Sequence, residues 1–128
     1  MFSVPTYLAP SSIHGTGVYA AEPITAGTVI WDFTPGVDWE LSEEELAAFP
    51  ERLRHQMESW CFLREDGVYV LCGDNAKFMN HSFEPNCDDK GDVTMAARDI
   101  AAGEELTCDY RAFDWKTKQD GLEFQRAG

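Results

Sequence analysis

The most informative segment of the sequence is Lys77-Phe78-Met79-Asn80-His81-Ser82-Phe83-Glu84-Pro85-Asn86-Cys87. Asn80 and His81 can each donate and accept hydrogen bonds, so as neighbours they could clamp a polar ligand. Pro85 and Asn86 favour a turn a few residues after His81. Taken alone, His81 could equally be a satisfied structural histidine or the base of a nucleophilic site, so the neighbouring segments have to decide.

Two further segments carry informative patterns. Residues 97–110 end in Gly103-Glu104-Glu105-Leu106-Thr107-Cys108-Asp109-Tyr110, and their pattern is that of a strand, a turn, a second strand and a tyrosine. In His14-Gly15-Thr16-Gly17-Val18-Tyr19-Ala20, two glycines one residue apart let the backbone approach a ligand closely. This segment lacks the third glycine of a dinucleotide fingerprint. Each segment has an ordinary alternative, namely a core tyrosine and a simple turn between strands.

Short strands separated by turns account for most of the chain. β-branched and aromatic runs predict strands at residues 6–9, 17–20, 28–33, 61–64, 68–72, 93–97 and 105–108. The residues 65–67 between two of these strands include Asp-Gly and predict a hairpin turn. With a single substantial helical segment besides, the sequence predicts a β-rich α+β fold.

The helical segment begins at Ser42, which forms a capping-box pattern with Glu45. Its apolar face, at spacings of three and four, comprises Leu46, Phe49, Leu53, Met57 and Trp60. Pro50 either kinks this helix or opens a second one. His55 lies near the apolar face and is expected to be a core or rim residue.

Acidic residues dominate the composition. The chain of 128 residues is one domain in size and carries 23 Asp and Glu against 10 Lys and Arg, a net charge of -13. Such a chain repels nucleic acid, whose binding requires Lys and Arg on phosphates. It attracts a basic partner, unless the acidity serves solubility alone. Residues 111–128, with three acids and four bases, are nearly neutral.

The cysteine spacing and the hydropathy of the chain indicate a protein of the reducing interior of the cell. Cys61, Cys72, Cys87 and Cys108 form no C-x-x-C pair, so no metal site is predicted. Residues 1–10 lack the features of a signal peptide, and no stretch approaches the roughly 20 apolar residues of a membrane helix. We expect an intracellular, soluble, cytoplasmic protein without a membrane partner, although a secreted effector stays open.

In order and spacing, the three segments resemble the SET-domain protein-lysine methyltransferases. Gly15-Thr16-Gly17 resembles the family's G-x-G motif, and Asn80-His81-Ser82 with Pro85-Asn86 resembles N-H-S-x-x-P-N. Residues 103–107 with Asp109-Tyr110 resemble G-E-E-L-T-x-D-Y, and residues 24–30 fit I-x-x-G-x-x-I. The resemblance covers residues 6–115, so that 116–128 form a short tail of a single domain, 1–128. It implies small curved sheets around a C-terminal pseudoknot.

The resemblance also implies a site. S-adenosylmethionine is the implied cofactor, and a lysine of a basic protein or peptide, histone-like tails included, is the implied methyl acceptor. Gly15, Thr16, Gly17 and Asn80 are expected at the amino-acid end of the cofactor. The backbone at Asn80-His81 is expected to accept the adenine amino group.

Tyr110 is expected to be the catalytic residue, at the point where the cofactor meets a lysine channel. Phe78, Cys108 and Phe113 are expected to line this channel, and Trp115 to stack on adenine. For Phe113 and Trp115 an ordinary core position is an equal alternative.

Cys108 and Phe83 depart from the family pattern. The family usually has Phe or Tyr at the position of Cys108, so a small thiol there predicts a roomier pocket and di- or trimethylation, unless Cys108 is merely packed. Many members carry Cys where this chain has Phe83, together with a zinc-binding tail. The segment 115–128 contains no cysteine, so we expect the site to be closed by tail aromatic and apolar residues or by the second subunit of a homodimer.

Two other functions remain open at this point. The first is a catalytically weak or inactive SET-fold module that binds a lysine-containing peptide. The second takes His81 with Cys87 or Cys108 as a metal or cysteine-nucleophile site. Binding of S-adenosylmethionine and metal analysis would separate these alternatives from a methyltransferase.

Overall fold

A computed structural model describes residues 1–90 and 92–112, and every structural statement below refers to these residues. In chain order the strands are β1 (Thr6–Pro10), β2 (Thr16–Ala20), β3 (Val29–Asp32), β4 (Trp39–Leu41), β5 (Cys61–Leu63), β6 (Tyr69–Leu71), β7 (Asn80–His81), β8 (Cys87–Asp89), β9 (Val93–Ala96) and β10 (Thr107–Cys108). The helices are α1 (Glu43–Ala47), α2 (Glu51–Trp60), η1 (Asn75–Phe78) and η2 (Tyr110–Ala112). The β-rich α+β prediction is therefore confirmed.

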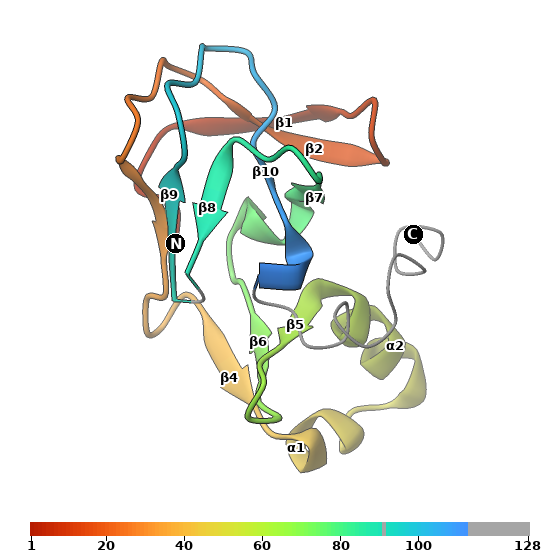
Figure 1. Cartoon of the computed structure of the whole chain (residues 1–128). Coiled ribbons are helices and arrows are strands. Elements are labelled where there is room, and N and C mark those ends of the chain that lie inside the picture. The colour runs from red at the N-terminus through yellow and green to blue at the C-terminus, as the bar shows by residue number, and fades with distance from the viewer. Residues whose placement is uncertain (91, 113–128) are drawn as a thin grey trace.

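The described strands form small separate sheets. β1 pairs with β2, β9 lies between β3 and β8, and β6 lies between β4 and β5, all antiparallel. β7 and β10 pair in parallel. In Figure 1, β10 lies near the centre of the molecule, with β1 and β2 above it, β8 and β9 to its left, and β4, β5, β6, α1 and α2 below.

The helical segment divides at Pro50, as one of the two predicted alternatives had it. Ser42 Oγ accepts from the Glu45 amide and Glu45 returns a bond to the Ser42 amide, so the predicted capping box is present. Pro50 is the N-cap of α2 with φ -53°, which suits the proline ring. No described helix is long and apolar enough to cross a membrane.

The apolar face of the helices is buried only in part. Leu46 and Met57 are buried, but Leu53 is 39% exposed. His55 is exposed, and its Nε2 lies 3.9 Å from Glu51 Oε1 one turn away, so of the two predicted positions, core or rim, the core position is wrong. Its position on the solvent side follows from helical geometry, because Met57, the buried residue of α2, is two positions away and therefore faces a different side of the helix.

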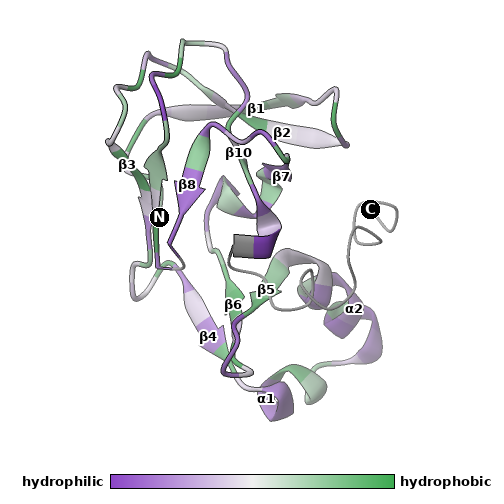
Figure 2. Ribbon diagram, in the orientation of Figure 1, coloured by the Kyte–Doolittle hydropathy of each residue, from purple (hydrophilic) through white to green (hydrophobic). Residues whose placement is uncertain are grey.

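One hydrophobic core joins the upper sheets to the central strands. It comprises Val18, Ala20, Ile24, Ile30, Met79, Cys87, Ala96, Ile100, Leu106 and Cys108. Phe78 and Tyr110 pack against it. Figure 2 shows hydrophobic ribbon on β5 and β6 and hydrophilic stretches along α1 and α2. Both residues of β10 are buried, which fixes the chain just before Tyr110.

A buried carboxylate fixes the chain that leads into η1. Asp38 is 2% exposed and accepts from the amides of Thr34 at 2.9 Å and Gly73 at 3.2 Å. Gly73 lies so close to Val37 that an added Cβ would stand 1.7 Å from the Val37 carbonyl oxygen. Only glycine fits there, and this close contact sets where η1 and then β7 begin.

Candidate active site

The parallel pairing of β7 with β10 brings the second and third motifs together. Asn80 lies opposite Thr107, and His81 lies opposite Cys108. The segment before β10 also pairs with β2, because the Ala20 amide donates to the Glu104 carbonyl at 3.0 Å and the Leu106 amide to the Val18 carbonyl at 2.8 Å. All three sequence motifs therefore meet at one place, as the resemblance implies.

Asn80 is the centre of this meeting point. Its Nδ2 lies 3.0 Å from the His14 carbonyl oxygen, 3.3 Å from the Thr16 carbonyl oxygen and 2.9 Å from Glu105 Oε2. An amide NH2 has two hydrogens, so these three acceptors exceed what it can satisfy. Asn80 and the three acceptors, here called the acceptor cluster, therefore suit a ligand group that donates several hydrogen bonds, such as an ammonium.

The two glycines of the first motif differ in role. Gly15 has φ +46°, and its carbonyl accepts from the Ser11 amide at 2.8 Å, which closes the turn between β1 and β2. Gly17 is buried, and a Cβ there would stand 2.4 Å from Glu105 Oε2. Gly17 thus makes room for the side chain of Glu105, which is an internal reason for this glycine that the sequence did not reveal.

His81 is a buried acceptor. It is 3% exposed, and its Nδ1 accepts a hydrogen bond from the Tyr110 amide at 3.0 Å. Burial lowers the pKa of His81, with Arg111 adding to this effect and Asp109 opposing it. Asp109 Oδ1 lies 3.7 Å from Nδ1, but an Nδ1 that accepts a hydrogen bond carries no proton of its own, so the imidazole is neutral and the contact is no ion pair. His81 therefore positions the backbone of Tyr110.

Tyr110 opens η2 and turns its hydroxyl back toward β7. The hydroxyl donates to the Met79 carbonyl oxygen, which belongs to the residue before Asn80. The ring meets His81 at 5.4 Å between centroids. The predicted catalytic tyrosine and the acceptor cluster are thus anchored on neighbouring residues of one chain segment.

Two of the predicted channel residues are described, Phe78 at the end of η1 and Cys108 in β10. Phe78 is half-buried against the core, and Cys108 is 3% exposed within it. Burial raises the pKa of Cys108, so its thiol stays protonated. Lys77 Nζ lies 5.2 Å from the Phe78 ring centroid and 5.8 Å from that of Trp60. Aromatic rings at this end of η1 therefore already face one cation.

Phe83 stands where many family members carry a cysteine, and its ring packs against Arg111 and His81. The Arg111 guanidinium lies 4.6 Å from the Phe83 ring centroid, and the Phe83 ring meets His81 edge-on at 4.6 Å. Among the described residues no group of three or more His, Cys, Asp and Glu is placed to hold a metal. Burial raises the pKa of Cys87 to about 12, which leaves that thiol a poor nucleophile.

Three residues of the site had no predicted role: Ser11, Asn86 and Glu105. Ser11 Oγ donates to the Glu105 carboxylate at 2.9 Å. Asn86 Oδ1 accepts from the Thr107 amide at 2.9 Å, and its Nδ2 donates to the Glu105 carbonyl at 2.7 Å. The turn pattern at Pro85-Asn86 was a usable signal for Asn86, whereas nothing local marked Ser11. Phe113 and Trp115 lie outside the described residues.

The neutral state of His81 predicts that the fold loses stability in mild acid. The folded-state pKa lies below the ordinary value of 6.5, so the stabilisation is complete above that value and is lost as the pH falls through the folded-state pKa. We expect the free energy of unfolding in urea to fall between pH 7.5 and pH 5, and to fall less in His81→Gln. His55→Gln, at an exposed histidine, should keep the wild-type slope. Equal slopes for wild type and His81→Gln would contradict the linkage.

The fold and the meeting of the three motifs define a SET-type domain. Residues 15–111 match the family model described as SET domain, and the chain belongs to this family. A protein of Yarrowia lipolytica named histone-lysine N-methyltransferase, H3 lysine-4 specific, is 36% identical over 84% of this chain. Human histone-lysine N-methyltransferase 2D is 32% identical over 88% of it. The chain spans 10% and 2% of the length of these two relatives.

Solved structures agree on the fold. A humanized mutant of the Chaetomium thermophilum Polycomb Repressive Complex 2, bound to the inhibitor GSK343, matches 91% of this chain and 16% of its own with TM-score 0.67 and 26% identity. Another structure of that complex, in an autoinhibited conformation bound to S-adenosylmethionine, matches 96% of this chain and 17% of its own with TM-score 0.67 at 23% identity. The β-rich architecture predicted from the motifs is thus a SET fold.

Proposed function

We propose that this chain transfers a methyl group from S-adenosylmethionine to the side-chain amine of lysine in a basic protein. The observation that carries the proposal is the Met79-Asn80 segment. The Met79 carbonyl oxygen accepts a hydrogen bond from the Tyr110 hydroxyl, and the next residue, Asn80, is the centre of the acceptor cluster. A methyl-transfer site needs these two features side by side, because one end of the cofactor has to be held while its methyl group is aligned. The names of the relatives support the same class of reaction.

The acceptor cluster fits the amino-acid end of S-adenosylmethionine. When bound, this cofactor supplies an electrophilic methyl group on a sulfonium. The carbonyl oxygens of His14 and Thr16 and the amide oxygen of Asn80 are acceptors for its ammonium. The backbone at Asn80-His81 is proposed to accept a hydrogen bond from the adenine amino group. Gly15 and Thr16 are exposed at the turn between β1 and β2, next to the carbonyl oxygens of the acceptor cluster.

The chain aligns the reactants and needs no dedicated base. A free lysine has a pKa near 10.4 and is charged at neutral pH. An apolar channel beside a sulfonium disfavours the ammonium, so its pKa falls and its proton leaves to water. His81 is buried with Nδ1 engaged by the Tyr110 amide, which leaves it a positioning role. Tyr110 Oη and the Met79 carbonyl oxygen are the groups that orient the methyl through weak C–H···O contacts.

The substrate is proposed to be a basic protein or peptide, with histone-like tails as one candidate. The net charge of -13 favours encounter with such a partner and disfavours direct binding of nucleic acid. We propose that the protein works inside the cell, without a membrane partner, and that a homodimer is one way to close the site. A SET-fold module that only binds lysine-containing peptides is the second candidate. The retained Asn80 acceptor cluster weighs against it, because a peptide binder has no use for a cofactor site.

Mass spectrometry of methylated product tests both the reaction and the pocket at Cys108. Incubation with S-adenosylmethionine carrying a deuterated methyl group and a panel of basic proteins should label lysine. The small Cys108 side chain holds no water against the amine, so di- and trimethyl-lysine should accumulate, whereas Cys108→Tyr should shift the product toward monomethyl-lysine. An acidic protein of similar size is the control substrate and should stay unlabelled. A wild-type product that stops at monomethyl-lysine would refute the roomier pocket.

A further inference from the structure

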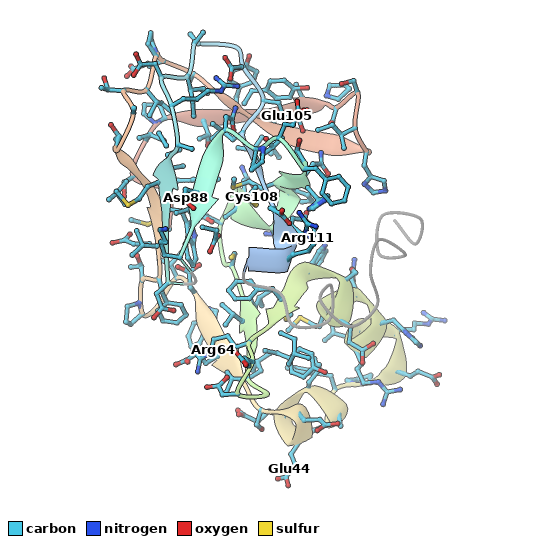
Figure 3. All side chains as sticks on the ribbon, in the orientation of Figure 1. Glu44, Arg64, Asp88, Glu105, Cys108 and Arg111 are labelled. Carbon is cyan, nitrogen blue, oxygen red and sulfur yellow. The ribbon has the colours of Figure 1, made fainter. Side chains whose placement is uncertain are left out.

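Glu105 is a member of the acceptor cluster, but the proposed function assigns it no role. We infer that Glu105 is a positioning residue for the cofactor: its carboxylate holds the Asn80 amide and makes the cluster anionic, so that the ammonium end of S-adenosylmethionine is selected. The inference rests on the proposed cofactor site and extends it to a residue outside that site's predicted set. Figure 3 shows Glu105 beside β1 and β2, apart from Cys108 and Arg111.

Contacts on three sides fix the carboxylate of Glu105. Ser11 Oγ lies 2.9 Å from both of its oxygens, and Asn80 Nδ2 lies 2.9 Å from Oε2. On the third side stands Gly17, where a Cβ would come within 2.4 Å of Oε2. Ser11 Oγ also accepts from the amide of Ile13 at 2.9 Å, so the serine is itself held by the turn. A side chain fixed in this way loses little further freedom when a ligand binds.

The charge of Glu105 is not neutralised by the contacts that the structure describes. Those contacts are the hydroxyls of Ser11 and Tyr19 and the amide of Asn80, all of them neutral. The neighbouring Glu104 differs, because Arg98 lies 2.8 Å from its carboxylate and Asn86 donates to it at 3.0 Å. The two adjacent glutamates thus have separate tasks. Glu104 pairs with Arg98, whereas the carboxylate of Glu105, itself a member of the acceptor cluster, has no cation among its described contacts.

The arrangement of acceptors around Asn80 indicates the role of the Glu105 carboxylate. With one Asn80 hydrogen drawn to Glu105, only one remains for the carbonyl oxygens of His14 and Thr16. The carbonyl oxygens of His14 and Thr16 therefore keep the capacity to accept a hydrogen bond from a ligand. The bond to Glu105 also fixes the direction of Asn80 Oδ1. An ammonium supplies up to three hydrogens and a positive charge, and charge-assisted bonds of this kind are about twice as strong as neutral ones. Glu105 acts through Asn80 and through its field, without touching the reacting atoms.

Calorimetric titration with two ligands tests this assignment. The ligands are S-adenosylhomocysteine and its deamino analogue, which lacks only the α-amino group. Glu105→Gln should weaken binding of S-adenosylhomocysteine by about tenfold, since a charge-assisted interaction is lost, and should leave the affinity for the deamino analogue unchanged. Glu104→Gln removes the same charge one residue away and should leave both affinities unchanged.

Each outcome decides the question. Ser11→Ala, which loosens the carboxylate without removing its charge, should also weaken S-adenosylhomocysteine more than the analogue, and it serves if Glu105→Gln fails to fold. An equal loss for both ligands would show a general structural role and overturn the inference, as would no loss for either. If the wild-type chain binds neither ligand, the proposed cofactor site fails and the role of Glu105 fails with it. Wild-type binding that Glu105→Gln leaves intact overturns the inference alone.

Discussion

Tyr110→Phe is expected to lower kcat by about 100-fold or more while the affinity for S-adenosylmethionine changes by no more than about twofold. The hydroxyl is the only part of the side chain that the substitution removes, and it donates to the Met79 carbonyl oxygen at the proposed reaction centre. The acceptor cluster on the next residue is left in place, so cofactor binding should survive. The measurement is steady-state turnover beside calorimetric binding of the cofactor.

The control for this substitution is Tyr7→Phe. Tyr7 is 45% exposed and stacks on Tyr19 at 5.5 Å between centroids, away from Met79. Loss of its hydroxyl should leave kcat unchanged. Turnover of Tyr110→Phe equal to that of the wild type would remove Tyr110 from the reaction.

Asn80→Ala is expected to weaken binding of S-adenosylmethionine by about 100-fold or more. The substitution removes the amide oxygen and frees the turn that Nδ2 holds through the His14 and Thr16 carbonyls. It also leaves the Glu105 carboxylate without one donor in a half-buried place, which costs about 1–3 kcal/mol of stability. Asn75→Ala, at an exposed asparagine of η1, is the matched control and should change neither quantity. Unchanged cofactor affinity in Asn80→Ala would contradict the placement of the cofactor.

Much of the fold was predictable where local chemistry decides it. The strands β1, β2, β3, β5, β6 and β9 lie within a residue or two of their predicted bounds. The capping box at Ser42 and the turn at Gly67, with φ +86°, are present as predicted. In each of these places the residues that set the structure are neighbours in sequence, so propensity and turn chemistry are enough.

The missed elements depend on distant partners. The strands β4 (Trp39–Leu41) and β8 (Cys87–Asp89) are short, and the sequence Cys-Asp-Asp of β8 has low strand propensity. They form because β6 and β9 supply a ladder for them. His55 shows the reverse case, since its place near the apolar face predicted a core or rim position, but it is exposed while Met57, two residues away, is the buried residue of α2.

The site divides in the same way. Asn80, His81 and Tyr110 were predictable because the family motifs mark them. Their partners were not, because Glu105 meets both Ser11 and Asn80 only after β2 has paired with the segment before β10. The reason for Gly17 likewise lies in the side chain of Glu105, which is remote in sequence. Tertiary pairing, and no local pattern, makes the acceptor cluster.

The most direct test of the central claim is calorimetric titration of the wild-type chain with S-adenosylmethionine. The account predicts saturable binding of one cofactor per chain, because the acceptor cluster is already assembled in the fold. Absence of saturable binding by a folded wild-type chain would contradict it, and would leave the SET fold here as a module that binds lysine-containing peptides.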